Sequence, residues 1–150
     1  MHASLTRLVL LAVISQPALL LAASPSNSVD VVAGFATAYN RHDVAQMMAR
    51  CAENVRWLTV TGDTVTVEAQ GRDNLRSAME AHFAGSPNTR SELIKVEGDG
   101  PMVVAIEKAM ADGRAPHKAQ CSASVYQLQD GRISNVWYFD AYRCEGAEDD

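Results

Sequence analysis

The segment over residues 29–58 constrains the fold more than any other part of the chain. Apolar side chains recur at helical spacing over residues 29–39 and again over 44–51, which predicts two consecutive amphipathic helices. Asp43 is placed to cap the second helix, and Gln46 follows three residues later, as in a capping box. A segment rich in β-forming residues follows at 55–60. Helices that lead directly into strands favour a mixed α and β architecture.

The rest of the chain predicts one more helix and a run of strands. Gly71 and Arg72 open the helix, and Gly85 with Pro87 ends it. Turn-forming residues at 61–63, 98–101, 112–113 and 130–131 separate predicted strands over 64–69, 91–97, 102–110, 115–128 and 133–142. Three helices and an antiparallel sheet packed on one side of them make an α+β domain.

The first residues predict a secretory signal peptide. Residues 1–7 carry one positive charge, residues 8–21 are apolar, and the small residues Ala22, Ala23 and Ser24 follow. An uncleaved membrane anchor is the alternative, although the apolar run is short for a span and contains Pro17. We therefore expect a signal peptide over 1–23, a leader over 24–28, one domain over 29–144 and an acidic tail over 145–150. The protein would be exported, either periplasmic or secreted.

Composition argues against several kinds of site. The net charge is −5 and no basic patch is present, which argues against nucleic-acid binding. The four histidines are scattered and no C-x-x-C pair occurs, so no zinc site is expected. Since there is also no glycine-rich phosphate loop, the sequence predicts no cofactor and no metal.

Three cysteines, Cys51, Cys121 and Cys144, leave at least one thiol unpaired within an exported monomer. A tight turn at residues 130–131 would put Cys121 opposite Asp140. Cys144 would then lie roughly 13 Å farther along the strand, beyond the reach of a disulfide. Cys121 is therefore predicted to be a buried thiol, and a pair between Cys51 and Cys144 stays open.

Three motifs are similar to one family. They are Tyr39-Asn40-Arg41-His42-Asp43 at the helix break, Gly71-Arg72-Asp73-Asn74-Leu75 at a helix start, and the closing strands Tyr126-Gln127-Leu128-Gln129-Asp130-Gly131-Arg132-Ile133 and Tyr138-Phe139-Asp140. Together with the order of elements they resemble the SnoaL-like group of the nuclear-transport-factor-2-like superfamily, which includes ketosteroid isomerases and polyketide cyclases. The resemblance implies a cystatin-like α+β roll. In that fold a cone-shaped, curved antiparallel sheet wraps about three helices of the N-terminal half and leaves an apolar pocket. It also implies a homodimer through the outer sheet face.

The resemblance does not extend to the catalytic residues of ketosteroid isomerases. When the helix break is aligned with that of ketosteroid isomerases, Phe35 takes the position of their oxyanion-hole tyrosine. Thr59 takes the position of their general-base aspartate, and Ser124 lies near that of their second oxyanion-hole carboxyl. Phe35 offers no donor and Thr59 is no base near neutral pH, so steroid isomerisation by that mechanism is not expected. The SnoaL-type cyclases use a carboxylate on the closing strands, and Asp140 is the nearest match.

Strand alternation decides which side chains could line the pocket. A tight hairpin at residues 112–113 would pair Glu107 with Lys118. One face would then carry Glu107, Lys118, Gln120, Ser122, Ser124 and Tyr126, and the other Val104, Ile106, Ala119, Cys121, Ala123 and Val125. Alternation alone predicts that the polar face is exposed to water, whereas the resemblance implies that this face lines the pocket. A β-bulge near Ser134 would bring Tyr138 and Asp140 onto the same face.

If that face points inward, Glu107 and Asp140 are the candidate acid–base groups, because desolvation raises the pKa of a carboxyl. The alternatives are a salt bridge from Glu107 to Lys118 and a strand-end hydrogen bond for Asp140. His42 is a third candidate catalytic residue, as a base at the cavity mouth or, alternatively, as a group that caps a helix. The expected substrate contacts are Tyr39, Trp57, Ser122, Ser124, Tyr126 and Tyr138. Trp137 and Phe139 would face outward, toward a dimer partner.

Three functions are consistent with these features. The first is cofactor-independent proton transfer, of isomerase, cyclase or dehydratase type, on a small apolar molecule. The second is non-catalytic binding of such a molecule. The third is a protein-interaction domain whose outer sheet face carries the function, because one fold can host all three.

Overall fold

The computed structural model describes residues 27–110 and 120–144. Its elements are α1 (Ser28–Asn40), α2 (Val44–Ala49), β1 (Cys51–Thr61), β2 (Thr64–Gln70), α3 (Arg72–Gly85), β3 (Arg90–Asp99), β4 (Met102–Met110), β5 (Gln120–Gln129), β6 (Arg132–Phe139) and β7 (Tyr142–Arg143). The predicted signal peptide, most of the leader, the acidic tail and Lys118 lie outside the described residues. Within the described part, no helix has the length and apolar character needed to span a bilayer.

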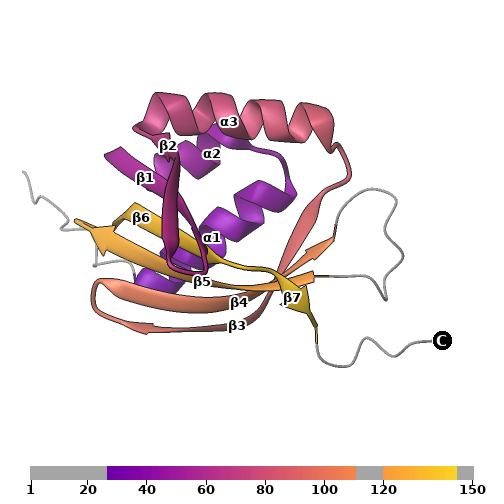
Figure 1. The fold of residues 1–150 in the computed structure, drawn as a ribbon. Coiled ribbons are helices and arrows are strands. Elements are labelled where there is room, and N and C mark those ends of the chain that lie inside the picture. Colours follow the sequence, from indigo (N-terminus) through magenta and orange to yellow (C-terminus); the bar gives the residue numbers. More distant parts are fainter. Residues whose placement is uncertain (1–26, 111–119, 145–150) are drawn as a thin grey trace, which may run out of the picture.

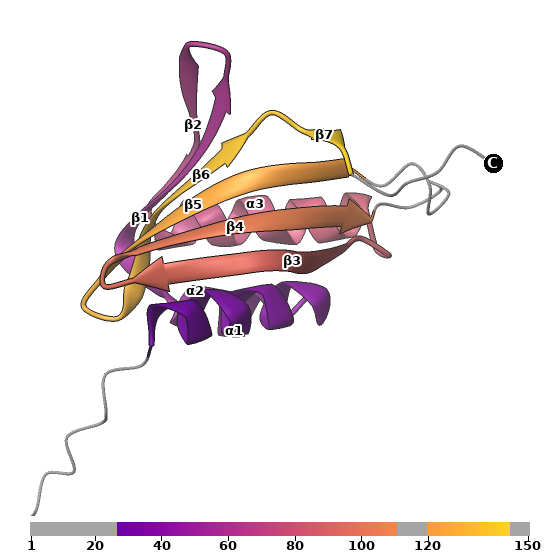
Figure 2. The ribbon, with the colours of Figure 1, turned by 90° about the horizontal axis from the view of Figure 1, so that it is seen from below.

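The three helices pack on one side of a curved, open sheet, as Figures 1 and 2 show from two directions. The strand order is β2-β1-β6-β5-β4-β3, and β7 adds to β5. The predicted α+β class is confirmed. One detail differs, because β1 and β6 pair in parallel while the other neighbours are antiparallel. A parallel pair needs a long connection, and here β2, α3 and three further strands lie between its two members.

The predicted helix pair is present, and the core forms beneath it. Asp43 accepts a hydrogen bond of 2.9 Å from the backbone N–H of Gln46, which confirms the predicted cap. The second helix is shorter than predicted, because Cys51 already pairs with Ile133 as the first residue of β1. Helices and sheet contribute fully buried side chains to one core, among them Val32, Met47, Met48, Val55, Leu75, Val103, Ile133 and Val136.

The predicted register between β4 and β5 is wrong, although the predicted faces are right. Glu107 lies opposite Ser122 instead of Lys118, and Ala105 lies opposite Ser124. The last pair is Ala109 with Gln120, so the strands are not joined by the tight turn assumed at residues 112–113. The shift from 118 to 122 is an even number of residues, and an even shift returns every side chain to the same face.

The predicted β-bulge is present in β6. Gln127 pairs with Asn135 and Leu128 with Ile133, which leaves Ser134 as the extra residue. The bulge puts Tyr126 and Tyr138 on the same inner face, where their hydroxyls meet at 2.9 Å. On the outer face Ile94, Val104 and Phe139 are exposed, and the homodimer through this face stays a prediction.

The predicted state of the cysteines is wrong, since Cys121 and Cys144 form a disulfide with their Cα atoms 5.0 Å apart. The bulge at Ser134 is one of two reasons why the predicted pairing fails, because it shifts the register of β6 against β5 by one residue. A second shift occurs after β6, so that β7 places Tyr142 rather than Asp140 opposite Cys121. Cys144 is then two residues beyond the partner of Cys121 instead of four, close to the observed disulfide, and Cys51 is the free, buried cysteine.

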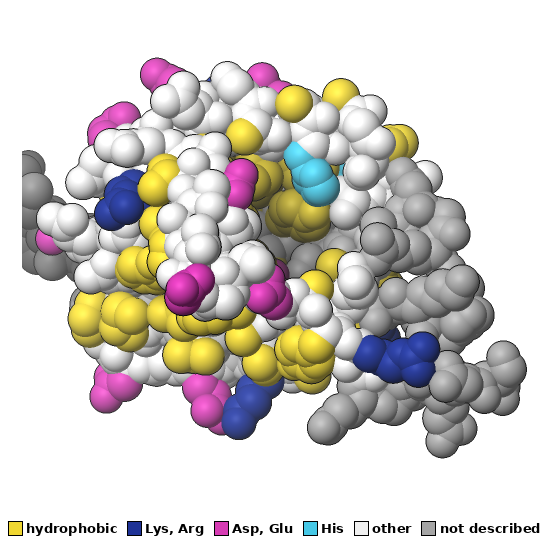
Figure 3. Space-filling view, in the orientation of Figure 1, with side chains coloured by type: hydrophobic (Ala, Val, Ile, Leu, Met, Phe, Trp, Pro, Cys, Tyr) yellow, Lys and Arg dark blue, Asp and Glu magenta, His cyan; other side chains and the backbone are white. Residues whose placement is uncertain are grey.

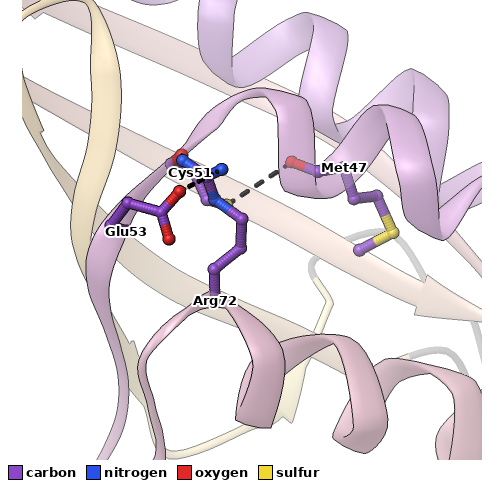
Figure 4. A network of polar contacts seen from close by, with 4 residues as sticks. All are labelled: Met47, Cys51, Glu53 and Arg72. Carbon is purple, nitrogen blue, oxygen red and sulfur yellow. Dashed lines mark hydrogen bonds and ion pairs between the residues drawn. The ribbon is translucent and has the colours of Figure 1, made fainter.

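Arg72 joins the start of α3 to the start of β1 (Figure 4). Its Nη2 donates to the backbone oxygen of Cys51 at 2.8 Å, and its Nη1 lies 2.6 Å from Glu53 Oε1. The thiol of Cys51 donates to the backbone oxygen of Met47 at 3.4 Å. These contacts hold the thiol between two helices, where water does not reach it.

We expect Cys51 to resist alkylation while the protein is folded. Burial raises the pKa of its thiol to about 12, although Arg72 acts in the opposite direction. At pH 8 roughly one thiol in ten thousand would then be the reactive thiolate. Mass spectrometry after iodoacetamide treatment should show an unmodified Cys51 in buffer and a modified one in guanidinium chloride. Modification at equal rates in both solutions would contradict the burial.

Candidate functional site

A buried carboxylate surrounded by hydroxyl groups lies on the inner face of the sheet. Glu107, on β4, is only 7% exposed. Its Oε1 accepts hydrogen bonds from Ser124 Oγ at 2.5 Å, Tyr126 OH at 2.6 Å and Tyr138 OH at 2.9 Å. Its Oε2 accepts from Ser91 Oγ at 3.1 Å and from Tyr138 OH at 3.0 Å. A buried charge needs such partners, and here four side chains supply them.

The strands explain why these groups meet. Ser124 and Tyr126 are two residues apart on β5, so both point inward beside Glu107. Tyr138 joins them from β6 because the bulge sets its register opposite Ser124. Ser91 reaches the carboxylate from β3, the strand on the other side of β4.

Both tyrosines of this cluster are hydrogen-bond donors at any ordinary pH. Burial raises the pKa of Tyr126 and Tyr138 well above the usual value, and the negative charge of Glu107 raises it further. A neutral phenol beside a carboxylate donates its proton to a hydrogen bond without losing it. Tyr138 is also held by Trp57, whose ring stacks on it with centroids 5.0 Å apart.

A cavity of about 310 Å³ opens next to the carboxylate. Its walls are mainly apolar and include Phe35, Ala36, Trp57 and Met79. Figure 3 shows a hollow beside the β1–β2 hairpin, with hydrophobic side chains inside it and a histidine at its edge. Of the residues predicted for the site, six line the cavity: Tyr39, Trp57, Glu107, Ser122, Tyr126 and Tyr138. Ser124 lies behind this lining, fully buried, and donates to Glu107.

The structure does not bring Asp140 to this cluster. Asp140 is exposed at the end of β6, where it accepts hydrogen bonds from Thr61 Oγ1 at 2.9 Å and from the backbone N–H of Gly62 at 3.3 Å. This is the strand-end role that the sequence left as the alternative. Asp140 is not among the residues that line the cavity.

His42 also lies outside the cavity lining. Its ring stacks on Phe83, with centroids 4.2 Å apart and planes inclined by 16°. Its Nε2 lies 3.1 Å from the backbone oxygen of Thr89 and 2.8 Å from Nη1 of Arg90. His42 therefore supports the start of β3, next to the cavity.

Four polar residues that line the cavity had no predicted role, namely Thr59, His82, Arg90 and Ser91. Ser91 could have been found from alternation along β3, because Leu93 on the same face packs against the core. His82 and Arg90 are exposed side chains that line the cavity. His82 shares a helix face with Met79 by its spacing, whereas no sequence pattern marks Arg90. The hydroxyl of Tyr39 lies 2.8 Å from His82 Nε2 and 3.2 Å from Thr89 Oγ1. Over residues 27–110 and 120–144, no three His, Cys, Asp or Glu side chains gather as metal ligands would.

Comparison with known proteins supports a family and a fold. A family model described as a SnoaL-like domain matches residues 32–136. No curated protein sequence matches the chain. An uncharacterized cystatin-fold protein from Novosphingobium aromaticivorans is 20% identical, with a TM-score of 0.66 over 76% of this chain and 98% of that one.

Two further solved structures carry names of enzyme classes. A proposed ketosteroid isomerase from Kribbella flavida is 16% identical, with a TM-score of 0.64 over 78% of this chain and 81% of that one. A proposed polyketide cyclase from Xanthomonas campestris is 18% identical, with a TM-score of 0.56 over 77% and 91%. At such low identities the likeness concerns the fold and not the reaction.

Proposed function

Because the chain belongs to the SnoaL-like family, we propose that its cavity binds a small apolar molecule and that Glu107 exchanges a proton with it. The observation that carries this proposal is one buried carboxylate that lines a cavity with mainly apolar walls. A volume of about 310 Å³ is at the lower end of the range for small-molecule sites.

The residues around Glu107 suit proton transfer. Glu107 would accept a proton from a C–H or O–H group of the bound molecule, and the electron pair of that bond would stay on the molecule. The hydroxyls of Tyr126 and Tyr138 fix the carboxylate, and Tyr138 could donate a hydrogen bond to the charge that develops. Isomerisation, cyclisation and dehydration all include such a proton transfer. The first two are the activities named for two structural relatives, the proposed ketosteroid isomerase and the proposed polyketide cyclase.

A second function, binding without chemistry, is favoured by one observation. The oxygens of Glu107 already accept hydrogen bonds from four side chains of the protein. Few lone pairs are left for a bound molecule, so the carboxylate could serve only to organise the floor of the cavity.

Solvent exchange tests the proposal without knowledge of the natural substrate. A panel of cyclic and aromatic ketones is incubated with the protein in D₂O, and deuterium uptake next to the carbonyl is followed by mass spectrometry. We expect faster exchange for at least one ketone. Ala109→Trp should lower that rate at least roughly tenfold, because Ala109 is exposed and lines the cavity and a bulky side chain there would obstruct entry.

Ala78→Trp is the matched control, because Ala78 is exposed on α3 and does not line the cavity. Equal loss of exchange in both variants would contradict a reaction inside the cavity. Ketones that bind without any exchange would favour the second function. Ketones that neither bind nor exchange would count against both functions.

A further inference from the structure

Arg90 is a cation that the proposed chemistry does not use. It is the first residue of β3, it is exposed, and it lines the cavity with His82 and Tyr39. The salt bridges within the described residues join Arg72 to Glu53 and Lys95 to Glu97, so none of them neutralises Arg90. Its charge is therefore available to a molecule in the cavity.

The guanidinium of Arg90 is held by one nitrogen only. Its Nη1 donates to the backbone oxygen of Thr89 at 2.7 Å and lies 2.8 Å from His42 Nε2. His42 Nε2 also lies 3.1 Å from the same backbone oxygen of Thr89, so the guanidinium and the imidazole meet at one carbonyl group. His42 is itself fixed by its stacking on Phe83. Within the described residues Nη2 and Nε of Arg90 have no hydrogen-bond partner, so a fork of N–H donors remains free.

The cavity is lined by two groups of opposite charge. Glu107 is buried and Arg90 is exposed, and the lining also includes apolar side chains such as Trp57 and Met79. An anionic group is repelled by Glu107 and attracted by Arg90. A single guanidinium matches the charge and the geometry of one carboxylate.

We propose that Arg90 binds a carboxylate, so that the molecule taken by this cavity is an apolar acid with its acid group beside Arg90. Its apolar body then reaches inward, and the atoms farthest from the acid group lie next to Glu107. This inference rests on the proposed function, because it assumes that the cavity takes a small apolar molecule at all.

A matched pair of probes tests the inference. 2-Naphthoate and 2-naphthamide have nearly the same shape and differ in charge. By isothermal titration calorimetry at low ionic strength, we expect the acid to bind roughly tenfold more tightly than the amide, as one charge-assisted contact at an exposed rim would give. Arg90→Gln should remove that preference and leave the affinity for the amide within about twofold. Arg90→Lys keeps the charge but loses the fork, so an intermediate preference is expected.

Arg56→Gln is the control, because it changes the net charge equally and Arg56 is exposed on β1 and does not line the cavity. It should keep the preference for the acid. Loss of the preference in Arg56→Gln as well would show general attraction by charge and would overturn the inference. Equal binding of acid and amide by the unmodified protein would also overturn it, while leaving the proposed function intact. Failure of both probes to bind would count against the proposed function itself, and the inference would fall with it.

Discussion

Glu107→Gln is expected to slow proton exchange in the cavity by roughly 100- to 10,000-fold, the usual contribution of a general base. Glutamine has the shape of glutamate, and its amide oxygen can still accept hydrogen bonds from Ser124 and Tyr126, as the carboxylate does. It cannot take up a proton near neutral pH. The rate of deuterium uptake by the most active ketone of the panel measures the effect, and circular dichroism confirms that the variant is folded.

Two further variants test whether the loss of exchange is specific to the carboxylate of Glu107. Glu80→Gln removes an exposed carboxylate from α3 and should leave the rate unchanged. Asp140→Asn removes the second carboxylate that the sequence singled out, and it should also have little effect, because Asp140 binds Thr61 and Gly62 outside the cavity lining. Exchange that survives in Glu107→Gln and is lost in Asp140→Asn would assign the chemistry to Asp140 instead.

The affinity of Glu107→Gln for a small molecule distinguishes catalysis in the cavity from binding without chemistry. If Glu107 is the base, Glu107→Gln should still bind 2-naphthamide, because the apolar walls around Trp57 and Met79 are unchanged. Slow exchange with normal binding is the expected combination. Slow exchange with lost binding would mean that Glu107 shapes the cavity, as in the non-catalytic function.

The faces of the sheet could be predicted from the sequence more securely than its register. Side chains alternate with a period of two along a strand, so the inward set at Glu107, Ser122, Ser124 and Tyr126 survived a register error of four residues. The bulge at Ser134 was predicted because an extra residue there brings Tyr138 onto the face of Tyr126. These local rules place Ser124, Tyr126 and Tyr138 on the same face as Glu107.

The single-residue shift after Phe139 and the exposed charges could not be predicted in the same way. The pairing of Cys121 depends on two irregularities, at Ser134 and after Phe139, and only the first had a signal in the sequence. The position of Arg90 at the cavity depends on where β3 begins relative to the helices. That position follows from packing across the whole domain, as the contacts of Thr89 and His42 illustrate.

Loss of the Cys121–Cys144 disulfide is expected to destabilise the domain by about 3 kcal/mol and to lower its melting temperature by about 10 °C. The disulfide joins residues separated by 23 positions, so it restricts the unfolded chain over a loop of moderate length. It also fastens β7, which contacts the sheet through only two paired residues, to β5. Thermal unfolding of the double variant Cys121→Ala/Cys144→Ala, followed by circular dichroism, measures the change.

Reductant distinguishes the disulfide from the side chains that form it. Dithiothreitol should lower the melting temperature of the unmodified protein to near that of the double variant, and it should not affect the double variant. Cys51→Ala is the control, because Cys51 is a free cysteine and its variant should respond to dithiothreitol as the unmodified protein does. A loss of that response in Cys51→Ala would mean that Cys51 takes part in the bond. A melting temperature that reductant leaves unchanged would mean that the bond between β5 and β7 contributes nothing to the stability of the fold.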